Sequence, residues 1–147
     1  MDESGVDKNC YKQRGWGKIG KPLVHEVSGK YMQRTSVLAG LCEKEILAPL
    51  LFQGSCNTEL FVKWIEQQLI PTLKKGQVVI MDNASIHKSP QVRCLIEEAG
   101  CRLIYLPPYS PDLNPIETFW ANMKKWIKEK FKSFNNTWNA LYAFFNN

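Results

Sequence analysis

Two short apolar runs, together with the proline-rich loop that follows them, constrain the fold of this chain more than any other feature. The first run is Val78–Met81, and it stops abruptly at Asp82. The second run, Leu103–Leu106, begins after a segment long enough to form a helix. Continuous apolar runs of this length are typical of strands buried on both faces of a parallel sheet. The pair therefore predicts a strand–helix–strand unit with parallel strands.

The loop after the second run contains four prolines within nine residues, 107 to 115. Proline fixes φ, so this loop is expected to be nearly rigid. It ends in Asn114-Pro115-Ile116-Glu117, which fits a helix start with Asn as N-cap, Pro at N1 and Glu at N3. Asp82 follows a strand, where open α/β sheets bind ligands. Two acids at the open edge of a sheet are typical of a metal-dependent enzyme.

The remaining patterns predict a mixed α/β sheet. Thr35–Leu41 and Ile46–Phe52 read as two strands with a turn between them, and Pro49 indicates that the second is an edge strand or carries a bulge. Asn57 is the expected N-cap of an amphipathic helix that ends at Pro71. Further helices are expected at 90–99, 115–131 and 137–145.

Length and charge indicate one domain spanning 1–147 that suits a polyanionic partner such as DNA. The net charge is +5, and basic residues gather near the start of the chain and in the helix at 115–131. Solvated lysine-rich faces would produce the same pattern. The five cysteines form no CxxC pair, which indicates reduced thiols in a cytoplasmic protein. A polar N-terminus and the lack of a membrane-length apolar run predict neither a signal peptide nor a membrane partner.

The helix that Glu117 begins has two chemically different sides. At about 100° per residue, Lys124 and Lys128 fall on the same face as Glu117. The aromatic residues and Met123 fall on the far or flanking side. A capping role alone would explain Glu117. An acid that leads a row of lysines, however, also suits a metal site beside a phosphate track.

Other polar residues have both a structural and a functional interpretation. Asp82 suits an Asx turn at a strand exit as well as a metal site. Asp2 would need to follow a first strand to join that site, and otherwise reads as a disordered terminal acid. His87, five residues after Asp82, could contact a phosphate. The serines lack a GxSxG context, and the two histidines lie far apart in the sequence, so neither a serine hydrolase nor a zinc site is indicated.

Four motifs carry a resemblance to a known family: DESG at residue 2, RGWGKIGKP at 14–22, MDNASIHKS at 81–89 and LPPYSPDLNPIETFW at 106–120. With them the chain resembles the catalytic domain of DDE-type transposases, in the bacterial insertion-sequence branch related to mariner elements. The 34 residues between Asp82 and Glu117, 83 to 116, agree with the spacing of that branch. The resemblance extends to about Phe131.

The resemblance implies an RNase H-like α/β fold, with a mixed five-stranded sheet, its first strand truncated, flanked by helices. It implies that Asp2, Asp82 and Glu117 are the catalytic acids and hold two Mg²⁺ (or Mn²⁺) ions. Such a site nicks DNA at the transposon ends and joins the freed 3′ end to target DNA.

The implied partners are double-stranded DNA, as transposon ends and as target, and a second copy in a homodimer. The expected DNA contacts are Lys124, Lys128, His87, Arg14, Lys18, Trp16 and Tyr109. Members of the family also carry N-terminal helix-turn-helix modules, and the sequence shows none. A separate N-terminal DNA-binding chain is therefore expected to recognise the element ends, and the protein is expected to act at the nucleoid.

Two alternative functions stay open at this point. The first is a catalytically silent, truncated transposase remnant that at most binds DNA, since the strand that should precede Asp2 is missing. The second is an RNase H-like nuclease acting on RNA–DNA hybrids, which would share the fold and the metals. The presence of all three acids favours the transposase over the remnant. The proline motif and the acid spacing favour it over the hybrid nuclease.

Overall fold

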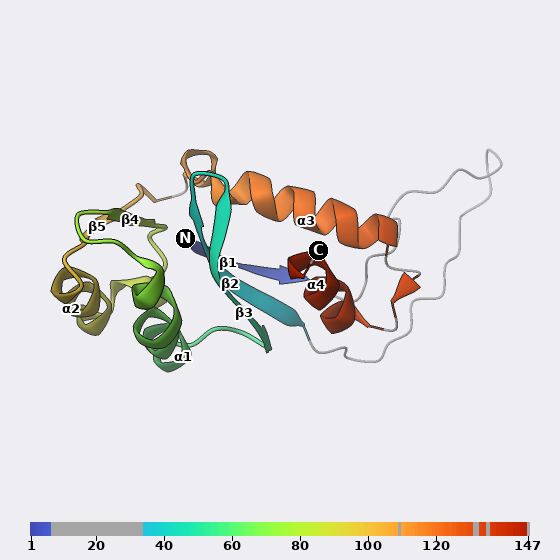
Figure 1. The fold of residues 1–147 in the computed structure, drawn as a ribbon, viewed down its shortest axis with the longest axis horizontal. Coiled ribbons are helices and arrows are strands. Elements are labelled where there is room, and N and C mark those ends of the chain that lie inside the picture. Colours follow the sequence, from blue (N-terminus) through green and yellow to red (C-terminus); the bar gives the residue numbers. More distant parts are fainter. Residues whose placement is uncertain (7–33, 109, 131–132, 135, 147) are drawn as a thin grey trace.

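The computed structural model describes residues 1–6, 34–108, 110–130, 133–134 and 136–146 (Figure 1). Its strands are β1 (Asp2–Val6), β2 (Thr35–Cys42), β3 (Glu45–Gln53), β4 (Val78–Met81) and β5 (Arg102–Tyr105). Its α-helices are α1 (Thr58–Trp64), α2 (Pro90–Glu98), α3 (Ile116–Lys130) and α4 (Thr137–Phe145). The strands and helices predicted between residues 35 and 145 are confirmed to within a few residues at their ends. The exception is α1, which continues as a π-helical turn and then a 3₁₀ turn that contains Pro71.

The strands form two sheets. One is antiparallel with the order β1-β2-β3, and the other is the parallel pair β4-β5. The parallel pair confirms the predicted strand–helix–strand unit. The single five-stranded sheet implied by the resemblance does not form among the described residues. One backbone hydrogen bond, in which the amino nitrogen of Met1 donates to the carbonyl oxygen of Ile80 at 2.8 Å, links the two sheets.

The start of the chain differs from the prediction. The family resemblance implies that Asp2 follows a first strand, whereas in the structure Asp2 begins β1 and pairs with Ala39. The pairing continues to Val6 opposite Thr35. The free edge of β2 offers partners for the backbone N–H and C=O groups of these residues, which therefore form a strand. Asp2 is part of a ladder and is not a loose terminal acid.

Two hydrophobic clusters cover the two faces of β2. Leu38 packs with Phe61 of α1 in a cluster that also contains residues of α2 and β4. Val37 and Ala39 pack with Trp120 of α3 in a second cluster, to which α4 also contributes. Successive strand residues point to opposite faces, so this alternation places α1 and α2 on one side of β2 and α3 and α4 on the other.

The prediction that Val78–Met81 is buried on both faces is wrong. Val79 and Met81 are buried against the α1 and α2 side. Val78 and Ile80 are 45% and 41% exposed. α3 and α4 pack on the β1–β3 sheet, and no described helix covers the corresponding face of β4 (Figure 1). The apolar run therefore has one buried face and one open face.

Local predictions about Asn57 and Pro49 are confirmed. The side-chain oxygen of Asn57 accepts a hydrogen bond from Leu60 N at 2.8 Å, as expected of an N-cap. Pro49 lies in the edge strand β3, beside Ala48, which has a φ of 50°. The four cysteines that the structure describes are free thiols. Among the described helices, none is both long and apolar enough to span a membrane.

Candidate active site

Asp82 stands directly after β4, where the strand opens into a loop. Its Oδ1 atom accepts a hydrogen bond from the backbone N–H of Ala84 at 3.1 Å. The same oxygen accepts a hydrogen bond from Nδ1 of His87. The side chain is 45% exposed. The interaction with His87, helped by the Ala84 N–H, lowers the pKa of Asp82 below its usual value, so this acid is ionised at neutral pH.

His87 is inside the protein, which corrects the prediction that it contacts a DNA phosphate. It is 1% exposed, and its ring stacks on Phe61 with the ring centroids 4.4 Å apart. Its backbone carbonyl oxygen accepts a hydrogen bond from the Tyr105 hydroxyl at 2.7 Å. The ring packs against Phe61 of α1, and its Nδ1 atom faces Asp82 and not solvent. The sequence did offer a signal for this role, since a histidine five residues after a strand-end acid can fold back on it.

Asp2 reaches the same region from β1. The residue is 7% exposed, and its Oδ1 atom accepts a hydrogen bond from Glu3 N at 2.7 Å. Burial, together with the smaller effect of the negative charges of Asp82 and Glu117, raises the pKa of Asp2 to about 6. That influence shows that the structure brings the three predicted acids into one electrostatic neighbourhood.

Glu117 and Asp82 line one cavity of about 420 Å³. Glu117 is exposed in the first turn of α3, and its backbone N–H donates to the carbonyl oxygen of Asn114 at 3.0 Å. The proline-rich loop, with Pro107, Pro108 and Pro111, forms another wall of this cavity. The loop thus sets the helix start opposite the end of β4, as its rigidity predicts.

A cation that the sequence analysis did not select also lines this cavity. Lys88 is exposed and lies on the wall with Asp82. Its place follows from the 3₁₀ turn Ser85–Lys88, which buries His87 and leaves the next side chain outside. A lysine beside two carboxylates in an open cavity can hold an anionic group such as a phosphate.

The exposed side of α3 carries the predicted row of lysines behind Glu117. Lys124 and Lys128 are exposed, whereas Met123 and Ile127 are fully buried in the second cluster. The burial pattern confirms that Glu117 heads a basic face while apolar residues pack inward. The other predicted DNA contacts, Arg14, Lys18, Trp16 and Tyr109, lie outside the described residues.

The three acids suit a divalent cation in their chemistry. Carboxylate oxygens are the ligands that Mg²⁺ and Mn²⁺ prefer, and a cation would stabilise the ionised form of Asp2 against the burial and the neighbouring charges that raise its pKa. As the side chains stand in the described residues, no three histidine, cysteine, aspartate or glutamate groups are close enough to hold a metal. The donor set fits, and binding requires these side chains to turn toward one another.

Known proteins share the sequence family and the fold of this chain. The sequence profile of a family described as "DDE superfamily endonuclease" matches residues 1–137. The chain belongs to this family. The match includes Asp2 in β1, Asp82 directly after β4 and Glu117 in the first turn of α3.

Two relatives are identical to this chain at about one aligned residue in three. The Tc1 transposase of Caenorhabditis elegans is 32% identical over 150 residues, which cover 93% of this chain and 55% of that protein. An uncharacterized 39 kDa protein of insertion element IS630 from Shigella sonnei is 30% identical over 122 residues, covering 74% of this chain and 35% of that protein. The chain thus spans about half or less of the length of these two relatives.

Solved structures share the fold. The Mos1 strand transfer complex matches with a TM-score of 0.67 and 19% identity, over 95% of this chain and 49% of that one. The Mos1 mariner paired-end complex with Mn matches with a TM-score of 0.63 and 18% identity, over 97% and 50%. The α/β fold of this DDE domain is therefore similar to part of the Mos1 structures.

Proposed function

We propose that this chain is the catalytic domain of a DNA transposase, which cleaves DNA strands at transposon ends and transfers them to target DNA. The observation that carries the proposal is the convergence of three acids from distant parts of the chain. Asp82 and Glu117 line one open cavity, and both charges act on the buried Asp2. The relatives support it, since the Tc1 protein is a transposase.

Asp2, Asp82 and Glu117 would hold two Mg²⁺ (or Mn²⁺) ions in this proposal. When bound, such ions activate the attacking water or 3′-hydroxyl and stabilise the leaving oxygen. One of the Mos1 structures is described as containing Mn, which agrees with the choice of metal.

The protein groups then have separate tasks. His87 fixes Oδ1 of Asp82, so that the second carboxylate oxygen stays free for the cavity. The open cavity leaves room for a DNA strand between Asp82 and Glu117. Lys88 would contact the phosphate beside them. Lys124 and Lys128 would hold the DNA backbone farther along α3, a role that the exposed face of the helix supports.

The partners follow from the same proposal. Double-stranded DNA is the substrate, both as transposon end and as target. The Mos1 neighbours include a paired-end complex with a left transposon end, and a homodimer would allow this protein to cut two ends together. Recognition of the element ends would come from a separate N-terminal DNA-binding chain. Arg14, Lys18, Trp16 and Tyr109 remain predicted DNA contacts.

The test is Mn²⁺-dependent nicking of supercoiled plasmid DNA, with Asp82→Asn as the first variant. Loss of the carboxylate charge is expected to reduce nicking by roughly three orders of magnitude. Asp112→Asn is the matched control, because Asp112 is an exposed acid in the proline-rich loop that does not line the cavity. This control should retain full activity.

Three results would contradict the proposal. Equal nicking by the wild type and Asp82→Asn would show that the site is wrongly assigned. A folded wild-type chain that binds plasmid without metal-dependent nicking would indicate the silent remnant. Faster cleavage of an RNA–DNA hybrid than of duplex DNA would indicate an RNase H-like nuclease.

A further inference from the structure

The 3₁₀ turn between β4 and α2 directs two side chains of the candidate active site in opposite directions. The turn is Ser85–Lys88. His87 is buried and its Nδ1 atom faces Asp82, whereas Lys88 is exposed and lines the cavity. These are consecutive residues of one turn, so the path of the backbone at His87 decides where both side chains lie. Their orientation therefore depends on what holds the backbone of this turn.

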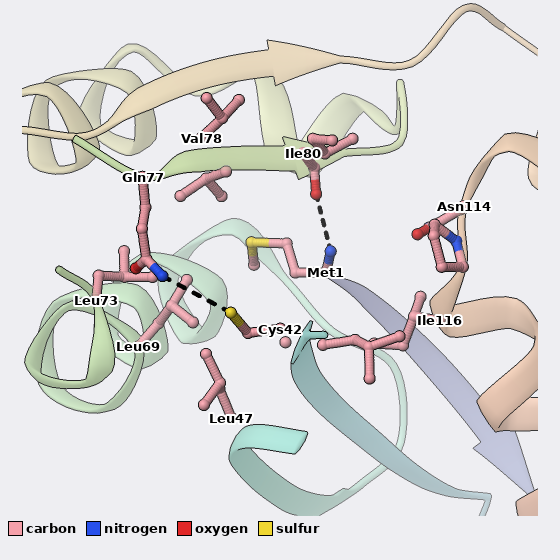
Figure 2. A pocket seen from close by; sticks show the side chains of 14 residues that line it. Met1, Cys42, Leu47, Leu69, Leu73, Gln77, Val78, Ile80, Asn114 and Ile116 are labelled. Carbon is pink, nitrogen blue, oxygen red and sulfur yellow. Dashed lines mark hydrogen bonds between the residues drawn. The ribbon is translucent and has the colours of Figure 1, made fainter. Parts of the chain in front are cut away.

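β4, the strand before the turn, is held along both edges. β5 pairs with it in parallel as far as Met81 opposite Tyr105. On the other edge, the Met1 nitrogen donates a hydrogen bond to the Ile80 carbonyl oxygen at 2.8 Å (Figure 2). The backbone that leads to Asp82 is thus fixed by its neighbours. The turn after it lies beyond the ladder and needs a contact of its own.

The carbonyl oxygen of His87 needs a hydrogen-bond donor that the following backbone does not supply. His87 is buried, so an unpaired carbonyl oxygen here would lose its hydrogen bonds to water without replacement. A 3₁₀ turn continues through the N–H three residues on, but that residue is Pro90, which has no N–H. Ser89 is extended, with a ψ of 134°, so the turn also ends there. The donor has to come from another element.

Tyr105 of β5 is that donor. Its hydroxyl donates to the His87 carbonyl oxygen at 2.7 Å. Burial raises the pKa of the Tyr105 hydroxyl above its ordinary value, so the hydroxyl keeps its proton at neutral pH. Arg93 of α2 lies over the Tyr105 ring, with its Cζ atom 5.7 Å from the ring centroid. Tyr105 therefore joins β5, α2 and the turn.

The ring of His87 depends on this backbone contact for its position. Nδ1 donates to Oδ1 of Asp82. Nε2 is buried and has no hydrogen-bond partner among the residues that the structure describes. Stacking on Phe61 restricts the plane of the ring, but it leaves the ring free to slide within that plane. The position of the His87 backbone therefore decides whether Nδ1 reaches Asp82.

We propose that Tyr105 is a positioning residue of the candidate active site. Its hydroxyl fixes the turn, so that His87 orients the carboxylate of Asp82 and Lys88 extends into the cavity. Tyr105 is not among the residues that line this cavity, so it acts through the turn and does not touch the DNA. The expected effect on metal binding rests on the proposed function, whereas the effect on the turn does not.

The experiment compares Tyr105→Phe, which removes the hydroxyl and keeps the ring, with the same change at Tyr142. Tyr142 is exposed on α4 and does not line the cavity. All chains carry His25→Gln, which leaves His87 as the one histidine of the sequence. Proton NMR measures how fast the Nδ1 proton of His87 exchanges with water. Isothermal titration measures Mn²⁺ affinity.

Amide hydrogen exchange separates the turn from the rest of the fold. The His87 amide donates to the Ala84 carbonyl oxygen at 3.1 Å within the turn. The Leu106 amide donates to the Met81 carbonyl oxygen at 2.8 Å, directly beside the substituted residue. Loosening of the turn accelerates exchange at His87 alone, whereas a general loss of packing accelerates exchange at both amides.

Tyr105→Phe is expected to loosen the turn and leave the fold intact. Exchange of the Nδ1 proton and of the His87 amide should accelerate about tenfold, with little change at Leu106. The Tm should fall by no more than about 4 °C, because one hydrogen bond is lost. Mn²⁺ affinity should fall about tenfold, as for loss of a group that orients a metal ligand. Tyr142→Phe should match the wild type in every measurement.

Four results would overturn the proposal. They are unchanged exchange at His87, equal acceleration at Leu106, equal changes in Tyr142→Phe, and unchanged Mn²⁺ affinity where the wild type binds the ion. A wild type that binds no Mn²⁺ and does not nick DNA would count against the proposed function alone. Exchange of the Nδ1 proton of His87 then decides whether Tyr105 positions the turn.

A milder variant provides the test if Tyr105→Phe does not fold. Arg93→Gln removes the cation over the Tyr105 ring and keeps the hydroxyl. Glu97→Gln is its control, because it removes the same exposed ion pair of 3.3 Å and leaves the cation in place. Exchange of the His87 Nδ1 proton should accelerate about threefold in Arg93→Gln and stay unchanged in Glu97→Gln. Equal exchange in these two chains would then overturn the proposal.

Discussion

Asp2, at the start of β1, and Asp82, directly after β4, are the same residue type, yet their pKa values are shifted in opposite directions. Asp2 is 7% exposed, and its burial raises its pKa to about 6. The side chain of Asp82 is 45% exposed, and the hydrogen bond from His87 lowers its pKa. Desolvation determines the first case and a specific partner determines the second. In the folded chain, Asp2 therefore has a higher proton affinity than Asp82.

The two shifts have opposite consequences for stability. The pKa of Asp2 is about 6 in the folded chain, whereas the ordinary pKa of an aspartate is 3.8. Folding therefore favours the protonated form of Asp2. Its contribution is most favourable at low pH and is lost as the pH rises through 6. Asp82 has a lowered pKa, so its contribution is present above its ordinary pKa and is lost as the pH falls. Ionisation of Asp2, which a metal site would need, therefore lowers the unfolding free energy of the metal-free protein.

The largest expected effect is from Asp2→Asn, which should separate activity from stability. Nicking should fall by roughly three orders of magnitude, as for Asp82→Asn, because the carboxylate charge is lost. At pH 7.5 the variant should nevertheless unfold at a higher temperature than the wild type, since a buried charge is removed. Plasmid nicking and calorimetry measure the two effects. Ser4→Ala, a change at a buried polar residue of the same strand, is the control for altered β1 packing.

The pH dependence of this stability difference sharpens the comparison. Between about pH 4 and 6.5, the unfolding free energy of the wild type should fall relative to Asp2→Asn by up to about 3 kcal/mol. At pH 4 the two proteins should be nearly equal. Urea unfolding at several pH values measures the difference. A constant difference across this range would show that burial does not raise the pKa of Asp2.

His87→Gln tests the other half of the comparison, the partner that lowers the pKa of Asp82. Loss of the ring removes the hydrogen bond to Oδ1, and Mn²⁺ affinity and nicking are expected to fall about 10–100-fold. Phe61→Leu is the control, since it removes the stacking on His87 while retaining the hydrogen bond. Isothermal titration with Mn²⁺ provides the measurement. Equal losses in both variants would reduce the role of His87 to packing.

The smallest effect is expected from the exposed lysines of α3, which do not line the cavity that contains Asp82. Lys128→Ala should weaken duplex DNA binding a few-fold and reduce the slope of log K against log salt by about 1. Lys125→Ala is the matched control, because Lys125 is also exposed but lies about 80° around the helix from Glu117. Binding titrations at several salt concentrations distinguish the two. An equal slope for both variants would indicate a general charge effect and no phosphate track.

The proline-rich loop made its part of the site predictable from local pattern. The loop rigidity and the helix start at Ile116 follow from the prolines, and Glu117 stands in the first turn as expected. The end of β4 at Asp82 was equally readable, because the apolar run stops there. His87 was assigned the wrong partner, since burial against Phe61 depends on a helix about 25 residues away in sequence.

Sequence pattern also failed where a neighbouring element was needed. The run at Val78–Met81 looks buried on both faces, yet whether a face is covered depends on where α3 packs. Asp2 looks like a loose terminal acid, yet the edge of β2 gives it a strand to pair with. Both errors concern interactions between segments far apart in the chain, which periodicity does not contain.

Local physics therefore specified most of the helices and strands of this protein, and the positions of Asp82 and Glu117 at the ends of their elements, from residue order alone. Proline geometry, capping and apolar periodicity act over a few residues, so they can be read before the chain folds. The shifted pKa values of Asp2 and Asp82 were decided by tertiary structure. Desolvation and strand pairing depend on which distant surfaces meet, and only the folded chain brings Asp2, Asp82 and Glu117 into one field.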